Sequence, residues 1–418
     1  RLAADPGVRE VIVAPGNPGM VDVAEVRGDV PLDDHGAIVA LARASRSELV
    51  VIGPEAPLAA GLADRLVAAS FAAFGPTRAA ARLEASKSFC RDVASAAGVP
   101  IPDGASFVDA GAALAFVRQF GAPLVIKADG LAAGKGVTVC ATTDRAEAAI
   151  GDAMVRGAFG AAGERIVVER ALTGREASLI VLTDGESTVA LPAARDHKRI
   201  GEDDTGPNTG GMGAFSPLAD LPHDEAARLV DGFHRPILAE LARRGIRFRG
   251  ALYAGLMLTP DGPSLLECNV RFGDPETQVL LARLETPLAP LLLGAATGSL
   301  GETAGHLGLS DGRVRSGSAA VGIVLAAAGY PGRPRTGDAI DLDRDALGGA
   351  SLFWSGVRAA PGGGLTTDGG RIATVVARGP DVGAAAAAAH AAADAVRFDG
   401  RQLRRDIGRV VAFAGPRA

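Results

Sequence analysis

The sequence predicts a multidomain protein of the α/β and α+β classes, with an open parallel sheet at the N-terminus and mixed sheets after it. Three observations lead to this prediction. The chain has 418 residues, more than a single hydrophobic core usually organises. Its first part alternates short β-branched runs with helical patterns. Two prolines within residues 98–102 then interrupt the alternation, and a new unit begins.

The N-terminal unit follows a β-α-β order. Its first helical pattern starts after Asp33 and Asp34, whose side-chain oxygens can cap the first turn. In chain order we expect a strand at 8–14, a helix at 33–44, a strand at 49–53, a helix at 57–70, a strand ending at 74–76 and a helix at 77–97. This order is typical of a parallel sheet with helices on its faces.

The second unit has the pattern of a small α+β lobe followed by longer strands. In chain order we expect strands at 124–127 and 137–142, a helix at 144–155, and strands at 165–169, 177–182, 251–258 and 264–268. Residues 191–217 are polar and glycine-rich, so we expect a long functional loop there, followed by a helix. A terminal lobe from about residue 301 adds strands at 319–325 and 371–377 and an alanine-rich helix at 384–395.

Composition and charge exclude several classes of protein. The net charge is -5 with a pI near 5.8, and no long Lys or Arg run offsets it, so we expect no nucleic-acid partner. Pro and Gly interrupt the apolar stretches before they could span a membrane. Cys90, Cys140 and Cys268 lack CxxC spacing, which favours reduced thiols over disulfides or a zinc site. Without a signal-peptide pattern, we expect a cytoplasmic protein that binds small molecules.

The segment from Lys127 to Gly136 is rich in glycine and superficially like a P-loop. It fails that comparison, because three residues rather than four separate Gly130 from Gly134, and Gly136 replaces the Ser or Thr. As a turn between antiparallel strands, its backbone amides and the side chains of Lys127 and Lys135 could approach a phosphate. The alternative is an ordinary flexible hairpin with surface lysines.

The strand that ends near residue 269 carries a second candidate site. Side chains at alternate positions share one face of a strand, so Glu267, Asn269 and Arg271 should project together. A carboxylate and an amide oxygen suit Mg²⁺, and the guanidinium adds a planar donor fork for a phosphate or carboxylate. A solvated strand face that ends in a turn is the alternative.

The third candidate site lies in the polar loop. Asp196-His-Lys-Arg199 is followed by the glycine-rich run 204–213, whose backbone amides could hold an anion or an acyl phosphate. We interpret His197 as a positioning residue, because no second acid–base partner is visible. Glu169 and Glu176 flank a strand end where a nucleotide could bind, although carboxylates in such positions are usually solvated.

Together these motifs resemble the ATP-grasp ligases and, within them, the phosphoribosylamine–glycine ligase family. The resemblance extends over nearly the whole chain and depends on the order in which several strings occur. These strings are 13–17 (VAPGN), 52–58 (IGPEAPL), 74–77 (FGPT), 126–136 (IKADGLAAGKG), 196–199 (DHKR), 204–213 (DTGPNTGGMG), 252–257 (LYAGLM), 271–278 (RFGDPETQ), 329–332 (GYPG) and 336–338 (TGD). Such ordered co-occurrence favours the functional interpretation of each motif.

The resemblance also implies which residues bind each ligand. The implied metal ligands, for Mg²⁺ or Mn²⁺, are Glu267 and Asn269. The implied ATP-binding residues are Lys87, Lys127, Gly134, Lys135, Gly136, Glu169, Leu172 and Glu176, with adenine near 169–172 and ribose at Glu176. The implied catalytic residues are Arg271, Asp196, Lys198, Asn208 and Gly210. The implied substrate-binding residues are Asn17, Asp204, Thr205, Pro207, Thr209, Gly211, Tyr253 and Asp274.

The reaction that the resemblance implies joins glycine to 5-phosphoribosylamine at the expense of ATP, in purine biosynthesis, through glycyl phosphate. The implied partners are these small molecules, and we expect a monomer. The implied domains are an N-terminal substrate domain (1–80), an ATP-grasp region (81–300) and a C-terminal lobe (301–418). Within the ATP-grasp region, we expect a lid lobe at about 103–171 and a central domain at about 172–300.

One departure from the family concerns the start of the chain. Family members open with a strand and a glycine-rich turn, whereas this sequence begins at Arg1 inside the helix that follows. We therefore expect Asn17 and its neighbours to form the phosphoribosylamine phosphate pocket. One alternative is a carboxyaminoimidazole-type ATP-grasp ligase, which the sequence of residues 196–213 disfavours. The other is a nucleotide-binding protein without catalytic activity.

Overall fold

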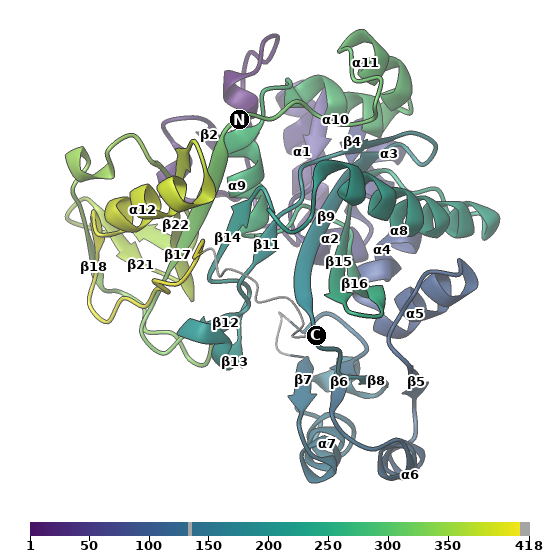
Figure 1. Ribbon diagram of the computed structural model, residues 1–418. Helices are drawn as coiled ribbons and strands as arrows, with labels where there is room; N and C mark the ends of the chain where they lie inside the picture. Colours follow the sequence, from purple (N-terminus) through teal and green to yellow (C-terminus); the bar gives the residue numbers. More distant parts are fainter. Residues whose placement is uncertain (133–135, 410–418) are drawn as a thin grey trace.

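The computed structural model describes residues 1–132 and 136–409 (Figure 1). In the N-terminal unit, short strands lie among helices and are parallel, as predicted, but they form two separate pairs instead of one sheet, and the strand at 25–26 was not predicted. The strands are β1 (Ile12–Val13) with β2 (Glu25–Val26), and β3 (Leu49–Val51) with β4 (Ala72–Phe74). Helix α1 (His35–Ala44) begins where predicted, because the Asp34 carboxylate accepts a hydrogen bond of 2.9 Å from the Ala37 amide.

The structure divides two helices that we predicted as continuous. Residues 57–70 form α2 (Glu55–Ala59) and α3 (Leu62–Ala68), separated at Gly61, whose φ of 87° ends the first helix. Residues 77–97 form α4 (Arg78–Ala85) and α5 (Lys87–Ala96). Ser86 is extended between them, and its side chain accepts a hydrogen bond of 3.1 Å from the Phe89 amide. The new cap makes Lys87 the first residue of α5.

The small lobe is a four-stranded antiparallel sheet with helices on one face, at the bottom of Figure 1. Its strands, in sheet order, are β5 (Gly104–Phe107), β8 (Ile166–Arg170), β6 (Leu124–Ala128) and β7 (Val137–Cys140). Its helices are α6 (Ala110–Phe120) and α7 (Thr143–Ile150), which continues as a π-helical turn over Gly151–Val155. β6 and β7, which the glycine-rich motif separates in the sequence, pair antiparallel, as predicted.

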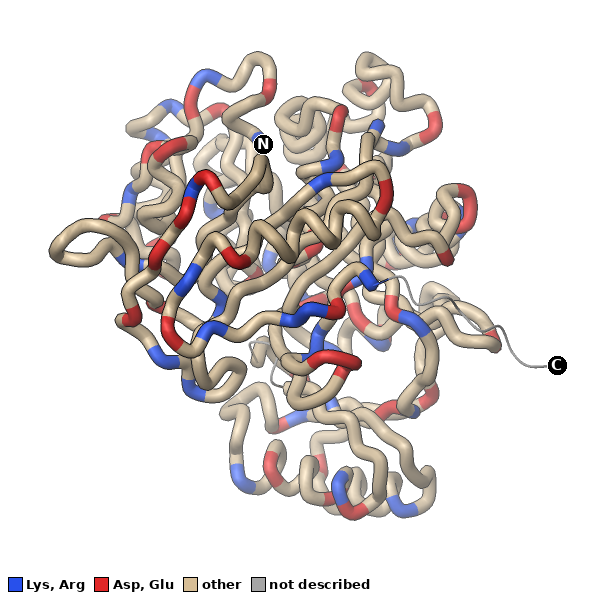
Figure 2. Tube along the Cα trace, turned by 60° about the vertical axis from the view of Figure 1, so that its left-hand side comes forward, with Lys and Arg blue, Asp and Glu red and all other residues tan. Residues whose placement is uncertain are grey.

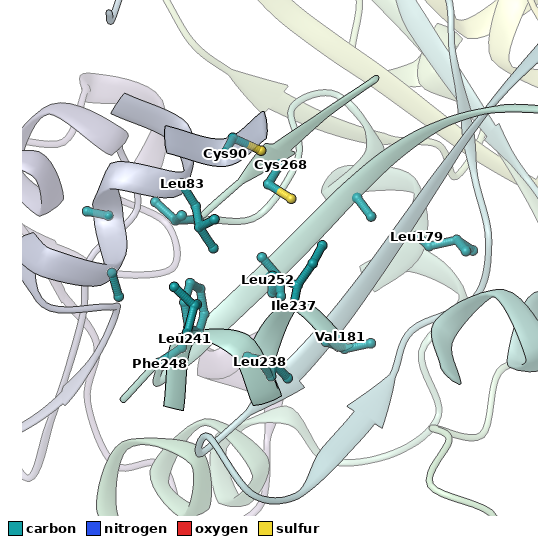
Figure 3. Packing of buried hydrophobic residues seen from close by; sticks show 14 of the residues in the cluster. Leu83, Cys90, Leu179, Val181, Ile237, Leu238, Leu241, Phe248, Leu252 and Cys268 are labelled. Atoms are coloured by element: carbon teal, nitrogen blue, oxygen red, sulfur yellow. The ribbon is translucent and has the colours of Figure 1, made fainter. Parts of the chain in front are cut away.

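The central sheet is buried on both faces. Its strands, in sheet order, are β10 (Thr188–Ala190), β9 (Arg175–Thr183), β15 (Gly250–Thr259) and β16 (Gly262–Asn269). Leu179 and Val181 of β9 pack with α8 (His223–Arg243), which Figure 3 shows from close by. The alternate side chains Ile180 and Leu182 pack with α10 (Leu288–Thr297) on the other face.

Residues 191–217 are not the structureless loop that we predicted. They form four short strands, namely β11 (Arg195–Asp196), β12 (Arg199–Gly201), β13 (Thr205–Asn208) and β14 (Gly213–Ser216). β12 and β13 pair as a hairpin, and β14 pairs with β17 (Ala319–Ala326) of the terminal lobe. The sequence lacks the alternation of a strand here, because backbone pairing, and not a local apolar pattern, stabilises these short elements.

The terminal lobe contains two sheets, on the left of Figure 1. The first has the order β11-β14-β17-β22-β19, with β22 at Arg371–Gly379 and β19 at Ser351–Trp354. The second comprises β20 (Val357–Ala359), β21 (Leu365–Thr367), β18 (Ala339–Leu342) and β23 (Val396–Arg397). The predicted alanine-rich helix is α12 (Val382–Ala393), which packs on the first sheet, and α9 (Glu276–Arg283) and α11 (Leu300–His306) complete the helices.

Charge and hydropathy of the described chain agree with the composition. Figure 2 shows acidic and basic residues interspersed along the trace. Within the described ranges, no helix is both long and apolar enough to cross a membrane. Cys90, Cys140 and Cys268 are buried free thiols, as predicted, and Figure 3 shows Cys90 beside Cys268 between α5 and β16.

Candidate active site

A cavity of about 1400 Å³ lies where the small lobe, the central sheet and the terminal lobe meet. Most of the residues that we predicted from the sequence line it, although they come from many different elements. These lining residues are Lys87, Lys127, Gly136, Glu169, Leu172, Glu176, Asp196, Lys198, Asp204, Asn208, Thr209, Gly210, Tyr253, Glu267, Asn269, Arg271 and Asp274.

Among the described residues, four predicted site residues are not among those that line this cavity. Asn17 instead caps a 3-10 turn and donates hydrogen bonds of 3.1 and 3.2 Å to the carbonyls of Trp354 and Ser355. The remaining described ones are Thr205, Pro207 and Gly211. Gly134 and Lys135 lie outside the described residues.

Glu267 is the electrostatic centre of the cavity. Its Oε2 lies 3.1 Å from Nζ of Lys87, and its Oε1 lies 3.6 Å from Nζ of Lys198. Burial would raise the pKa of Glu267, but these lysines outweigh burial and hold it well below its usual range. Burial lowers the pKa of Lys87, yet the Glu267 charge leaves that pKa raised overall. The carboxylate is therefore ionised and both lysines are charged.

Glu267 and Asn269 form a donor set that fits a hard divalent cation. They alternate on β16, where they pair with Gly255 and Tyr253 of β15, and both line the cavity. Among the described residues, no group of three or more His, Cys, Asp and Glu side chains could hold a metal. One carboxylate and one amide oxygen suit Mg²⁺ or Mn²⁺, which commonly takes its other ligands from water and phosphate.

Lys127 joins the small lobe to the central sheet. Its ammonium group lies 2.5 Å from Oε2 of Glu169 and donates a hydrogen bond of 2.8 Å to the Leu266 carbonyl. The other oxygen of Glu169 accepts a hydrogen bond of 3.2 Å from Arg91. Lys198 similarly lies 2.9 Å from Oε2 of Glu176. The cationic side chains of the site are therefore fixed by carboxylates on different elements.

Arg271 is held by two acidic residues that sequence reasoning missed. Its guanidinium lies 3.0 Å from Glu55 and 3.1 Å from Glu84. Glu84 also accepts a hydrogen bond of 2.8 Å from the Val270 amide, while burial raises its pKa in spite of the Arg271 charge. The position of Glu55 at the start of α2, just beyond the carboxyl end of β3, could have indicated it, because side chains there often line binding sites in parallel sheets.

Asp196 lines the cavity close to a second carboxylate, that of the buried Glu276. Burial, followed by the charge of Glu276, raises the pKa of Asp196 well above its usual value. Ser178 connects Glu276 to Tyr253, with oxygen–oxygen distances of 2.9 Å to each. Burial and the charge of Arg404 lower the pKa of His197 to about 4, so His197 is neutral near pH 7, consistent with a positioning role.

The glycine-rich run 204–213 is anchored at several points along its length. Thr209 donates from both its amide and its hydroxyl to the Lys198 carbonyl, at 2.7 and 2.9 Å. Gly210 contacts Tyr330 and Arg371 of the terminal lobe. The carboxylate of Asp204 lies 2.7 Å from Arg404. The anchors Arg371 and Arg404 gave no signal in the sequence, because they lie outside the recognised motifs, whereas Tyr330 lies in the motif 329–332 but was not predicted as a site residue.

Fold and site together define an ATP-grasp protein: two α+β units face each other across a cavity that contains lysines and a carboxylate–amide pair. Comparisons with known proteins agree. Its N-terminal residues 1–84 match the phosphoribosylglycinamide synthetase N domain, residues 85–277 the ATP-grasp (A) domain and residues 320–410 the C domain. The chain belongs to the phosphoribosylglycinamide synthetase family, which makes it an ATP-dependent ligase and confirms the fold and family predicted from the sequence.

Individual relatives agree with this assignment. Phosphoribosylamine–glycine ligases from Mesorhizobium japonicum and Rhizobium meliloti are 46% and 45% identical, over 98% of this chain and 94% of each relative. The crystal structure of the Thermotoga maritima phosphoribosylamine–glycine ligase matches with a TM-score of 0.81 and 30% identity, covering 95% of this chain and 93% of that one. The biotin carboxylase domain of Hydrogenobacter thermophilus 2-oxoglutarate carboxylase, at 18% identity and a TM-score of 0.65, shares the fold.

Proposed function

We propose that this enzyme ligates glycine to 5-phosphoribosylamine, with cleavage of ATP to ADP and phosphate, to give glycinamide ribonucleotide in purine biosynthesis. Family membership supports the reaction. The observation that best supports chemistry at this site is the arrangement around Glu267, where Lys87 and Lys198 flank a carboxylate that shares a strand face with Asn269. This arrangement neutralises phosphate charge and is suited to phosphoryl transfer.

The proposed nucleotide site lies between the small lobe and the central sheet. Lys87 and Lys127 bind the phosphates, while the segment 169–172 holds the adenine and Glu176 the ribose. Glu267 and Asn269 would hold Mg²⁺ or Mn²⁺, which offsets phosphate charge when bound. The family resemblance gives the segment 130–136 a lid role over the nucleotide, and Gly134 and Lys135 of that segment lie outside the described residues.

The first chemical step is attack of a glycine carboxylate oxygen on the γ-phosphorus, which releases ADP and forms glycyl phosphate. The amine of 5-phosphoribosylamine then attacks the glycyl carbonyl carbon, and phosphate leaves with the electron pair of the broken bond. Arg271 provides a planar donor fork for the carboxylate, and the loop that contains Asn208 and Gly210 keeps water away from the acyl phosphate. Asp196 and Lys198 position this loop against the metal strand.

The remaining substrate contacts and the organisation of the chain are also proposals. Asn17, Asp204, Thr205, Pro207, Thr209, Gly211, Tyr253 and Asp274 hold glycine and phosphoribosylamine. The domains are 1–80, 81–300 and 301–418, with the lid lobe at about 103–171 and the central domain at about 172–300. The enzyme acts as a monomer, and its small-molecule substrates fit a cytoplasmic location.

Omission of single substrates tests this function. ADP release is measured with ATP, Mg²⁺, glycine and freshly formed 5-phosphoribosylamine, and then with each substrate left out. We expect full turnover when glycine and phosphoribosylamine are present together. Turnover with bicarbonate in place of glycine would favour a carboxyaminoimidazole-type ligase, and tight ATP binding without turnover an idle nucleotide-binding protein.

A further inference from the structure

Both backbone polar groups of Gly210 are held by side chains of the terminal lobe. The Gly210 amide donates a hydrogen bond of 2.8 Å to the Tyr330 hydroxyl, and its carbonyl accepts one of 2.5 Å from Nη1 of Arg371. A Cβ atom at position 210 would lie 3.1 Å from Cζ of Arg371. The guanidinium therefore packs directly against the glycine backbone, which leaves little room for a larger residue.

The same guanidinium also holds a second segment of the site. Its Nη1 donates a hydrogen bond of 3.1 Å to the Asp274 carbonyl, and its Nη2 lies 2.5 Å from the Asp274 carboxylate. Asp274 follows the metal strand β16 and precedes α9, so it belongs to the turn beside Arg271. Arg371 thus joins the run 204–213 to the turn at 271–275, across 161 and 97 residues of sequence.

We propose that Arg371 is a positioning residue that keeps the run 204–213 closed against the Asp274 turn and so excludes water from glycyl phosphate. This proposal rests on the proposed function. The Arg371 guanidinium is directed to Gly210 and Asp274, which favours a positioning role over direct substrate binding.

The backbone conformation of the run 204–213 explains why the Arg371 hydrogen bonds are needed. Gly206 and Gly211 have φ values of 77° and 108°, which glycine tolerates at little cost, so the ordered loop competes with many alternative conformations. Charge-assisted hydrogen bonds from Arg371 to a backbone carbonyl and a carboxylate offset the entropic cost of ordering the run 204–213. Without them, the loop should open more often over the reacting atoms.

Opening has a chemical consequence that can be measured. Water that reaches glycyl phosphate attacks it, and phosphate leaves with the electron pair while glycine is regenerated and a proton is released. The net reaction is hydrolysis of ATP to ADP and phosphate without glycinamide ribonucleotide. A loss of folding alone would lower both products together, whereas a loss of closure raises the ratio of ADP to glycinamide ribonucleotide.

The test compares Arg371→Gln and Arg371→Lys with the unmodified enzyme. ADP and glycinamide ribonucleotide are quantified in the same reaction, with KM for ATP measured separately. We expect a ratio near one in the unmodified enzyme, a ratio of about three or more in Arg371→Gln with product formation about tenfold slower, and an intermediate ratio in Arg371→Lys. KM for ATP should change little. Arg358→Gln removes a surface pair with Asp368 in the same lobe and serves as the matched control.

Each outcome of this experiment is decisive. A ratio near one in both folded Arg371 variants would overturn the proposal, and a raised ratio in Arg358→Gln would do the same because the effect would not be local. If circular dichroism shows that Arg371→Gln is unfolded, Arg371→Lys decides alone. Failure of the proposed function is distinguishable, since the unmodified enzyme would then form no glycinamide ribonucleotide at all.

Discussion

Oε2 of Glu267 lies 3.1 Å from Nζ of Lys87, although 180 residues separate them in the sequence. Lys87 is the first residue of α5, and Glu267 is near the end of β16, so the pair depends on the break in the helix at Ser86. With Lys198 on the other oxygen, the carboxylate pairs with two ammonium groups at once. When ATP and a divalent cation bind, Glu267 would hold the cation. Phosphate oxygens of ATP would then replace the carboxylate as the partners of Lys87 and Lys198.

Glu267→Gln should lower the ligase rate by about 100-fold or more, because a neutral amide holds a divalent cation weakly and removes the carboxylate paired with Lys87. The dependence of rate on Mg²⁺ concentration should shift to higher values. The free energy of unfolding should change much less than the rate. Asp261→Asn, at the exposed turn between β15 and β16, is the matched control. Unchanged kinetics in Glu267→Gln would refute the metal assignment.

Arg271→Lys should raise KM for glycine and lower stability. A lysine cannot reach both Glu55 and Glu84, and the buried Glu84 carboxylate then loses much of its compensation, at a cost of about 2 kcal/mol. Urea unfolding measures the loss of stability, and steady-state kinetics measure KM for glycine and for ATP. Arg247→Lys makes the same change in an exposed pair with Glu186. Equal effects of the two substitutions would show that the Arg271 fork has no special role.

His234→Gln should reduce the loss of stability at acid pH. His234 is fully buried in α8, with Nε2 3.2 Å from the Leu179 carbonyl, and burial lowers its pKa to about 4. The unfolded chain binds a proton near pH 6.5, whereas the folded protein does not until near pH 4. Stability therefore falls by about 3 kcal/mol as the pH decreases through this range.

The His234 prediction is checked by urea unfolding at several pH values between 7 and 4. The unmodified protein should lose more stability than His234→Gln, since glutamine does not titrate. His223→Gln, exposed at the start of the same helix, should behave like the unmodified protein. Parallel pH dependence in all three proteins would contradict the pKa assigned to His234.

Local patterns predicted the parts of the fold that local interactions determine. Alternation along β16 placed Glu267 and Asn269 on one face, and the spacing of Gly130 and Gly134 correctly excluded a P-loop. The four short strands within residues 191–217 could not be predicted in this way. β14 pairs with β17, more than a hundred residues later, β11 pairs with β14, and β12 pairs with β13, and these strands leave no periodic pattern in their own residues.

The same contrast applies to the site. Sequence motifs indicated the residues that face the cavity, but not the residues that hold them. Glu84 and Arg371 are single charged residues on a helix and at the start of a strand, where a charge usually means exposure to solvent. Only the tertiary fold brings them to Arg271 and Gly210.

Transfer of ¹⁸O from glycine to phosphate tests the central claim most directly. Glycine labelled with ¹⁸O in its carboxylate is incubated with enzyme, ATP, Mg²⁺ and 5-phosphoribosylamine, and the phosphate released is analysed by mass spectrometry. If the carboxylate attacks the γ-phosphorus, one glycine oxygen leaves in each phosphate, so we predict one ¹⁸O per phosphate formed. Stoichiometric product formation with unlabelled phosphate would contradict the glycyl phosphate route.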